Sequence, residues 1–600
     1  VLRTRSLTVD GQTYTGRAFL FTPQNLSALA GGAIRVEGAA NPTTAMWTGA
    51  ASAALTASEN WETAGALDLA FGSQDVLFAK AGTAATVDAD AVVRRLAFRA
   101  APGAAGFALN RSDPAHVLTV GEHLAACTND AAATAHTYTI DTPLALADAL
   151  TLHADTNQTL VLHSALNETD GERGAHTLTI DGTGAAASGF GAVTFAGTNV
   201  FGGALVVTTS LVRVSGVLAN PGDAYTGSPA NNGPDSINVN LRMGGAVNGG
   251  TYGLWLANAT VGKSVWIDNV IGTYSITAAA GTTNEVSGFV RYSRNDAHEW
   301  MKVEADAELI LSGGLQAVHS FRKSGPGTMR IRNVPVDCRR MSGFNPNEGR
   351  VVFEVPHNTF SNLVVGCWSN KHVVVETAVD FALTNGFVQV GGNGTDVGAC
   401  VALPSGSYAL DLQATTQRCQ KVAVLKNGTL TGEFPARLEI TEGWRAGDPE
   451  GYRSFSGQVV GGVGLHLCGP GTLTVTNALA SCGDLEVSDG ALELTGDGSW
   501  LNGTNVTVRG AGTLRLGAGR RRFGRKAVLH LGAAADSWAL DIPSGAVWSV
   551  AAAFDAEGRK LSPGTYGNAA SGAWDTRYAA HFPNGGVLRV RGGGLMLTIR

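Results

Sequence analysis

The stretch CGPGTLTVTN (Cys468–Asn477) joins a glycine-rich turn to a short run in which small, β-branched and apolar residues alternate. The chain repeats this phrase as SGPGTMRIRN (324–333), as RGAGTLRLGA (509–518) and, more loosely, as FGAVTFAGTN (190–199). An alternation with period two places successive side chains on opposite faces of a strand. One turn and one strand cannot bury an apolar face alone, so copies of the unit must stack on one another. The phrase therefore predicts an all-β, elongated β-solenoid.

The composition agrees with many tight turns between short strands. The 600 residues include 79 glycines, 44% are apolar and only 15% are charged, which excludes a disordered chain. The formal net charge of −6 is small for this length, so we expect no nucleic-acid partner. No apolar run approaches the roughly 20 residues of a membrane span, so we expect no membrane insertion by this segment. Helical patterns are confined to the regions near 144–152 and 58–69.

Six of the seven cysteines fall into pairs that are close in the sequence: Cys338 with Cys367, Cys400 with Cys419, and Cys468 with Cys482. Each pair could bridge neighbouring coils, most plausibly Cys400–Cys419 and Cys468–Cys482, with Cys127 left over. The alternative is that all seven are small buried thiols.

The two ends of the chain resemble each other. LTVDGQTYTGRAFLF begins at Leu7 and leads to GGAIRV, while AFDAEGRKLSPGTYG begins at Ala553 and leads to GGVLRV. Each end has a turn glycine (Gly11, Gly558), a tyrosine (Tyr14, Tyr566) and a variable loop. We therefore expect residues 1–41 to be the end of a preceding repeat module. N-terminal β-helix coils would follow at 42–235, less regular central coils at 236–427, and C-terminal coils with a closing segment at 428–600.

Solenoid ends expose unpaired strand edges and need to be covered. The aromatic residues Trp47 and Trp61 are candidates for a cap at the start of the coils. The aromatic loop Trp574–Phe582 is the candidate at the other end.

A family resemblance rests on these same residues. The opening TAMWTGA (44–50), ENWE (59–62), DVLF (75–78) and RRLAF (94–98) resembles bacterial proteins with autotransporter-associated β-strand repeats. GPGTLTVTNALASCGDLEVSDGALELTG (469–496) is similar to their core repeat, and SPGTY with GGVLRV to their closing segment. The resemblance implies a right-handed parallel β-helix on a secreted or surface-exposed bacterial protein. The membrane barrel of such proteins is missing, and residues 236–427 fit the repeat poorly.

The stretch VRYSRNDAHEWMKV (290–303) concentrates charged residues in one strand-like run. Alternation would put Arg294, Asp296 and His298 on one face. Polysaccharide lyases on this scaffold use a base together with a cation that neutralises the carboxylate of a uronate. Glycosidases on it use paired carboxylates, which Asp296 and Glu299 could supply here. The structural alternative is a solvent-facing strand with cross-strand ion pairs.

A basic cluster, GRRRFGRK, contains Arg520, Arg521, Arg522, Arg525 and Lys526. It could bind an acidic glycan, or it could be a solvated loop. No cofactor or metal is expected, because CxxC, HxxH, HExxH, GxSxG and phosphate-loop patterns are all missing.

The sequence therefore predicts a surface-exposed or secreted bacterial β-helix with a structural or adhesive role. Its expected partners are polysaccharides or cell-surface glycans, and neighbouring modules of the same longer chain. The alternative is a carbohydrate-active enzyme, a lyase or a glycoside hydrolase, on the same scaffold.

Overall fold

In a computed structural model, the chain forms two compact units, Val1–Val318 (unit 1) and His319–Arg600 (unit 2). It describes residues 2–15, 19–22, 25–29, 34–37, 44–63, 66–79, 84–99, 106–127, 134–168, 176–185, 189–207, 210–220, 237–240, 253–268, 274–292, 299–317, 321–338, 343–366, 371–384, 386–391, 406–448, 454–476, 483–495, 505–517 and 526–592. Each unit is a parallel β-helix, which confirms the predicted fold class.

The repeated phrase forms strands at all four positions. Its copies become β21 (Ala192–Phe195), β37 (Thr328–Ile331), the end of β53 (Gly464–Val475) and β56 (Thr513–Leu516). Alternate side chains point inward: Met329 and Ile331 are fully buried, as are Val193 and Phe195. Gly325, in the turn before β37, has φ +78°, a conformation that glycine adopts without strain.

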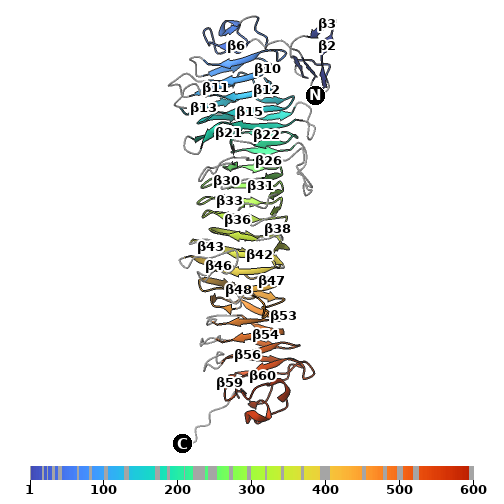
Figure 1. The fold of residues 1–600 in the computed structure, drawn as a ribbon, viewed down its shortest axis with the longest axis vertical. Helices are drawn as coiled ribbons and strands as arrows, with labels where there is room; N and C mark the ends of the chain where they lie inside the picture. The colour runs from blue at the N-terminus through green and yellow to red at the C-terminus, as the bar shows by residue number, and fades with distance from the viewer. Residues whose placement is uncertain are drawn as a thin grey trace. The chain divides into compact units, whose positions relative to one another are not determined.

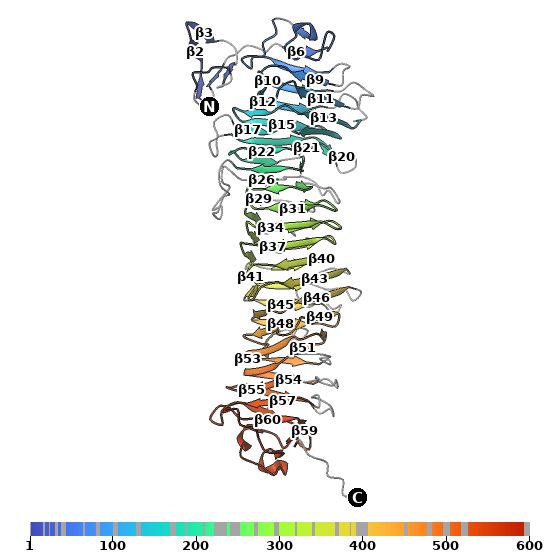
Figure 2. The same ribbon diagram turned by 180° about the vertical axis from the view of Figure 1, so that it is seen from behind.

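Unit 1 is built from coils that each contribute three strands, so that strands three apart in order pair in parallel (Figures 1 and 2). The first row contains β9 (Ala84–Val87), β11 (Gly106–Arg111), β13 (His136–Ile140), β16 (Gln158–Leu162), β21, β24 (Leu211–Val214), β27 (Gly253–Leu256), β30 (Tyr274–Ala278) and β33 (Glu299–Val303). The second row contains β14 (Leu144–Leu146), β17 (Leu166–Glu168), β22 (Thr198–Val200), β25 (Val217–Ala219), β28 (Thr260–Val261), β31 (Thr283–Val286) and β34 (Glu308–Leu311).

The third row of unit 1 contains β15 (Leu150–Ala154), β18 (Leu178–Gly182), β23 (Leu205–Val207), β26 (Ile237–Asn240), β29 (Val265–Asp268), β32 (Val290–Tyr292) and β35 (Leu315–Ala317). Strand β8 (Asp75–Phe78) and the longer strands β10 (Ala91–Phe98) and β12 (Leu118–Ala126) precede the second and third rows, and β10 pairs in parallel with both β8 and β12. A short hairpin, β19 (Gly184–Ala185) with β20 (Gly189–Phe190), projects from one coil.

Unit 2 continues the same three-strand period within its own coils. One row contains β36 (Phe321–Ser324), β39 (Phe344–Pro346), β42 (Asn362–Val365), β45 (Phe387–Val390) and β48 (Lys421–Val424). The next contains β37, β40 (Gly349–Phe353), β43 (His372–Thr377), β46 (Ser407–Asp411), β49 (Gly428–Thr431) and β52 (Gln458–Val459). The third begins with β38 (Val336–Cys338), β41 (Asn358–Phe360) and β44 (Leu383–Thr384).

A further parallel sheet of unit 2 contains β47 (Thr416–Cys419), β50 (Arg437–Ile440), β51 (Ser454–Phe455), β53, β54 (Leu485–Leu494), β55 (Asn505–Val508), β56, β57 (Val528–Leu531), β58 (Ala539–Asp541) and β60 (Ala552–Phe554). The closing sheet then follows, with β59 (Val547–Val550), β61 (Gly564–Tyr566) and β62 (Val587–Val590) in the order β59-β62-β61.

The core of each unit is a set of inward-facing columns. Register partners on successive coils stack, as Leu254 of β27 does on Ile276 of β30 and Ile276 on Met301 of β33, and all three are buried. Removing apolar surface from water stabilises the fold by about 25 cal/mol per Å². Each additional coil buries further apolar side chains in these columns and so adds to the stability. An aromatic column adds Phe78, Phe98 and Tyr138, whose neighbouring ring centroids lie 5.3 Å apart.

The predicted cap at the start of the coils is confirmed. Trp47 of β6 (Thr44–Trp47) and Trp61 of β7 (Trp61–Thr63) are cross-strand partners with ring centroids 5.0 Å apart. Strand β6 pairs in parallel with β8, and β7 lies antiparallel on its free edge, so β7 covers the open edge of the sheet.

The loop expected to cap the other end does so only in part. His581 stacks on Trp538 at 3.8 Å, and Phe582 and Tyr578 are buried. Trp574, in contrast, is 81% exposed, so it covers no core residue. Two short 3-10 turns, Ala569–Ser571 and Ala579–His581, shape this loop.

Three expectations from the sequence need correction or a limit. The region 144–152 contains strands β14 and β15, and among the described residues of 58–69 the only helical turn is the 3-10 turn Ser58–Asn60. None of the four described cysteines, Cys127, Cys338, Cys419 and Cys468, forms a disulfide bond, so the bridges expected at Cys419 and Cys468 are not formed. Cys419 points into the core, and the Cys468 thiol instead donates to the Ile440 carbonyl at 3.4 Å.

Within the described ranges, no helix has the length and apolar character needed to cross a lipid bilayer.

The described residues between 2 and 37 include a separate small sheet within unit 1. It contains β1 (Leu2–Thr4), β5 (Ile34–Val36) and β4 (Phe19–Phe21) in the order β1-β5-β4, and the hairpin of β2 (Ser6–Val9) and β3 (Gln12–Thr15) accompanies it. We call this segment the opening sheet. Beside it, β6 begins the coils, as Figure 1 shows.

Candidate functional site

The residues proposed for catalysis, Arg294, Asp296 and His298, lie outside the described residues. The structure does show that 290–303 is not one continuous strand, because β32 ends at Tyr292 and β33 begins at Glu299 in a different row. The stretch is therefore divided between two strands, and the placement of the three side chains on one face stays a prediction.

The described residues on either side of this break are engaged with neighbours. The Arg291 guanidinium lies 4.4 Å from the centroid of the Trp266 ring, and Lys302 pairs with Glu304 at 2.7 Å. Both contacts are typical of a structural outer face.

Only one member of the predicted basic cluster is described. Lys526 is exposed and lies two residues before the start of β57, while Arg520, Arg521, Arg522 and Arg525 lie outside the described residues. Glycan binding by this cluster therefore stays a prediction.

Charged residues elsewhere on the coils form partnered rows. On unit 1, His153 of β15 is the register partner of Asp181 of β18, and its Nδ1 lies 2.6 Å from the Asp181 carboxylate. Its Nε2 lies 3.1 Å from Asp155. The hydrogen bond to Asp181 raises the pKa of His153 to about 9, although burial opposes it, so the ring is a cation at neutral pH.

This group also includes His123, and together His123, His153 and Asp181 are the one set of described residues whose spacing could suit a metal ion. A metal ion would have to displace a proton from His153, because both of its ring nitrogens already face carboxylates. Burial lowers the pKa of His123, which keeps that ring neutral beside the His153 cation. The arrangement is an ion-pair row that ties coils together.

Unit 2 has a comparable row on β50, β53 and β54. Glu486 accepts from Arg437 at 2.8 Å and from Arg509 Nε at 2.7 Å. His466 belongs to the same row. Its Nδ1 lies 2.5 Å from the Arg437 guanidinium, and its Nε2 lies 2.8 Å from the Ser488 hydroxyl. Burial lowers the pKa of His466, so a neutral ring can accept from Arg437 and donate to Ser488.

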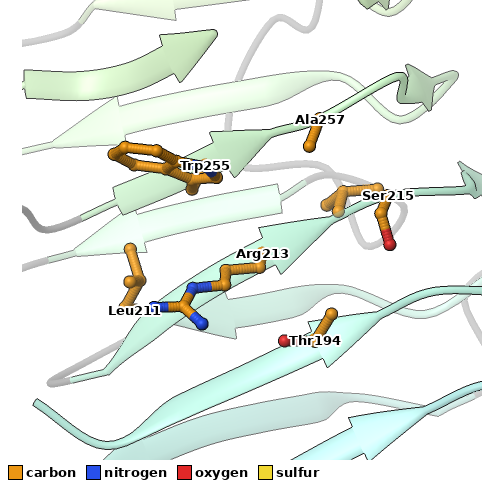
Figure 3. A pocket seen from close by; sticks show the side chains of 7 residues that line it. Thr194, Leu211, Arg213, Ser215, Trp255 and Ala257 are labelled. Atoms are coloured by element: carbon orange, nitrogen blue, oxygen red, sulfur yellow. The ribbon is translucent and has the colours of Figure 1, made fainter. Parts of the chain in front are cut away.

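One hollow on the first row of unit 1 differs from these rows. Thr194 of β21, Arg213 of β24 and Trp255 of β27 are register partners on three successive coils, and they line a hollow of about 350 Å³. Figure 3 shows the Trp255 ring and the Arg213 side chain projecting from neighbouring strands. Ser215 and Ala257, each directly after the end of its strand, and Leu211, the first residue of β24, also line the hollow.

The local sequence explains why these side chains point outward. In LVRV (211–214) and GLWL (253–256), Val212, Val214, Leu254 and Leu256 are buried, so Arg213 and Trp255 must face away from the core. Neighbouring parallel strands lie about 4.8 Å apart, so a ligand that contacts one of the two side chains also reaches the other.

Arg213 is exposed and has no hydrogen-bond or ion-pair partner among the described residues. The cations of the two rows above are held by carboxylates, whereas this guanidinium keeps its five donors for an incoming group. A half-buried indole beside an unpaired guanidinium suits a ligand with an apolar face and a negative charge.

Sequence reasoning did not find this site. The outward positions of Arg213 and Trp255 follow from the alternation, but their adjacency does not, because 41 residues separate them in the chain. Comparison of the chain with protein-family models, with curated proteins and with solved structures finds no match.

Proposed function

We propose that this chain is a structural and adhesive β-helix that binds acidic polysaccharide on the outer face of its first row, at the hollow of Arg213 and Trp255. The observation that carries the proposal is an unpaired guanidinium one strand away from a half-exposed indole, in a unit whose row of His153 and Asp181 is partnered. The alternative of a carbohydrate-active enzyme has no comparable support among the described residues.

The chemistry of a uronate residue fits the two side chains. Its ring presents C–H groups that can pack on the Trp255 indole, and its carboxylate can accept two parallel hydrogen bonds from the Arg213 guanidinium. Thr194 and Ser215 offer hydroxyl groups to the sugar hydroxyls at the rim. Such a shallow, open site supports weak binding of one sugar unit.

Weak sites become useful on a repeated scaffold. A polysaccharide offers many copies of its acidic unit, so several molecules on one surface would bind with avidity. This supports a location at the bacterial cell surface or outside the cell, as the resemblance to autotransporter-associated repeats implies. The small net charge gives no general attraction to nucleic acid, so selectivity would come from the hollow itself.

The test is binding of the whole chain to a panel of uronate-containing and neutral polysaccharides, by affinity electrophoresis and calorimetry. We expect weak, salt-sensitive binding to acidic members only. Trp255→Ala and Arg213→Ala should each weaken binding by about tenfold or more.

Matched controls use residues of the same kind elsewhere. Arg111→Ala removes an exposed arginine from the same row, and Trp574→Ala removes the most exposed described tryptophan. Binding that survives Trp255→Ala, or that falls equally in the controls, contradicts the proposal. Release of cleaved sugar from the panel would favour the enzyme alternative instead.

A further inference from the structure

The opening sheet and the closing sheet share one topology. In each, the last strand lies in the centre, pairing in parallel with the first strand and antiparallel with the strand before it. The central strands, β5 and β62, have the matching sequences IRV and LRV. Both segments also have a tight turn at a glycine with positive φ, Gly11 at +81° and Gly558 at +75°.

The register identifies equivalent residues. Arg35 lies between Arg3 and Leu20, and Arg589 lies between Ser549 and Thr565. Phe21 of the opening sheet corresponds to Tyr566, because each pairs with the first residue of the shared IRV or LRV motif. The sequence comparison that matched Tyr14 with Tyr566 was therefore wrong by one strand.

The opening sheet uses its arginine face to bind the first coils of unit 1. Arg35 Nη2 donates to the Gly121 carbonyl at 2.6 Å, and Arg35 pairs with Glu122 at 3.1 Å and with Asp148 at 3.0 Å. Arg35 and Asp148 are largely buried, with 13% and 9% of their side chains exposed. Leu20, next to Arg35, packs with Val92 and Ala147 in an apolar cluster.

Among the described residues, the equivalent face of the closing sheet contacts no such partner. Arg589 is exposed and, within the described part of unit 2, makes no hydrogen bond or ion pair. With Arg591, Pro563, Thr565 and Gly592 it lines a hollow of about 510 Å³. Trp574, 81% exposed, lies over Gly564 at the rim, where a β-carbon would meet the indole at 3.2 Å, and offers the apolar surface that Leu20 provides in the opening sheet. The opposite face is buried through Trp548, Tyr566 and Leu588.

We propose that this arginine face of the closing sheet is a docking surface for the opening coils of another β-helix. Its partner is a coil surface with the chemistry that Arg35 meets here: a backbone carbonyl and two carboxylates, like Glu122 and Asp148, beside a small apolar patch. The opening sheet is the internal precedent for this contact, and the unpaired Arg589 is complementary in charge to that surface. Such docking would join β-helices end to end.

The test uses two forms of the chain, each presenting one half of the interface. The whole chain presents its closing sheet, while its own opening sheet covers its first coils. A chain lacking residues 1–41 and carrying Arg589→Glu presents only bare first coils. Strand β6 begins at Thr44 and pairs with β7 and β8, so the truncation leaves the coils their own first strand. Far-UV circular dichroism checks that they remain folded.

We expect a one-to-one complex in sedimentation velocity when the two forms are mixed, and none when either is alone. Arg589→Glu in the whole chain should weaken it by at least about tenfold, whereas Lys526→Glu, the same charge change at another exposed site of unit 2, should leave it intact. Asp148→Asn in the truncated form should also weaken the complex.

A second route avoids the truncation. Arg35→Glu in the whole chain places a carboxylate against Glu122 and Asp148, which should release the opening sheet and allow self-association that Arg589→Glu abolishes. No complex in either format, or a complex indifferent to Arg589→Glu, overturns the proposal. Neither outcome bears on polysaccharide binding at Arg213, which is measured separately.

Discussion

The row of His153 and Asp181 and the hollow of Arg213 and Trp255 both lie on the outside of unit 1, on neighbouring sets of coils. In the first, register places opposite charges on adjacent strands, and the cation of His153 is held by two carboxylates. In the second, register places threonine and tryptophan on either side of the cation, so Arg213 has no acidic neighbour in its column.

The difference teaches how one scaffold separates two uses of charge. In a parallel β-helix, the residue one coil away is fixed by register, so complementary columns join the coils to each other. A column that breaks the complementarity costs little stability at an exposed position and leaves a donor for a ligand. Partnered columns should therefore matter for stability and the unpartnered one for binding.

The largest expected effect is on the partnered row of unit 2. Glu486→Gln leaves Arg437 and Arg509 without their shared carboxylate, in a site where only 14% of the Glu486 side chain is exposed. We expect the local free energy of opening of β53–β55 to fall by about 2–3 kcal/mol. Hydrogen exchange followed by mass spectrometry measures this for the peptides of these strands.

The matched control is Glu557→Gln, which removes a carboxylate that is 61% exposed and pairs with Arg559 in the turn of the closing segment. It should leave exchange in β53–β55 unchanged. Equal losses in both variants would show that the partnered row does not join the coils.

A smaller effect is expected from the row of His153, and it depends on pH. The folded-state pKa, about 9, lies above the usual 6.5, so the ion pairs stabilise the coils fully below about pH 6.5 and this contribution is lost as the pH rises through about 9. His153→Gln should therefore lower stability by about 1–2 kcal/mol at pH 6, allowing for the partial exposure of the pair, and by much less at pH 10. Urea unfolding of the unmodified chain and of His153→Gln at several pH values measures this difference in stability. A difference that grows as the pH rises would contradict the prediction.

The sequence predicted most of the fold because the fold is local. The alternation at Thr328–Ile331 or Thr513–Leu516 is enough to give a strand with one buried face, and the glycine turns allow such strands to stack. The cap at Trp47 and Trp61 was predictable for the same reason, since each aromatic lies in a short strand beside the first coil.

What could not be predicted depends on register between coils. The partner of Arg213 across the coil is set by the length of the intervening segment, which differs from one coil to the next: Leu254 pairs with Ile276, 22 residues on, whereas Ile276 pairs with Met301, 25 residues on. The prediction that the charged stretch 290–303 forms one strand was wrong for a related reason. Its composition indicated one strand, but the chain changes row between Tyr292 and Glu299.

The smallest expected effect on stability, and the sharpest test of the comparison, is at Arg213. Arg213→Ala removes an exposed side chain that has no partner among the described residues, so the stability of unit 1 should change by no more than about 0.5 kcal/mol. The same variant should lose most of the salt-sensitive binding to acidic polysaccharide. Arg213→Lys keeps the charge but not the planar fork of donors, so it should retain only part of the binding. Urea unfolding and affinity electrophoresis on the same samples give both values. A variant that loses stability and binding together would mean that Arg213 belongs to the partnered rows after all, and the separation of the two uses of charge would fail.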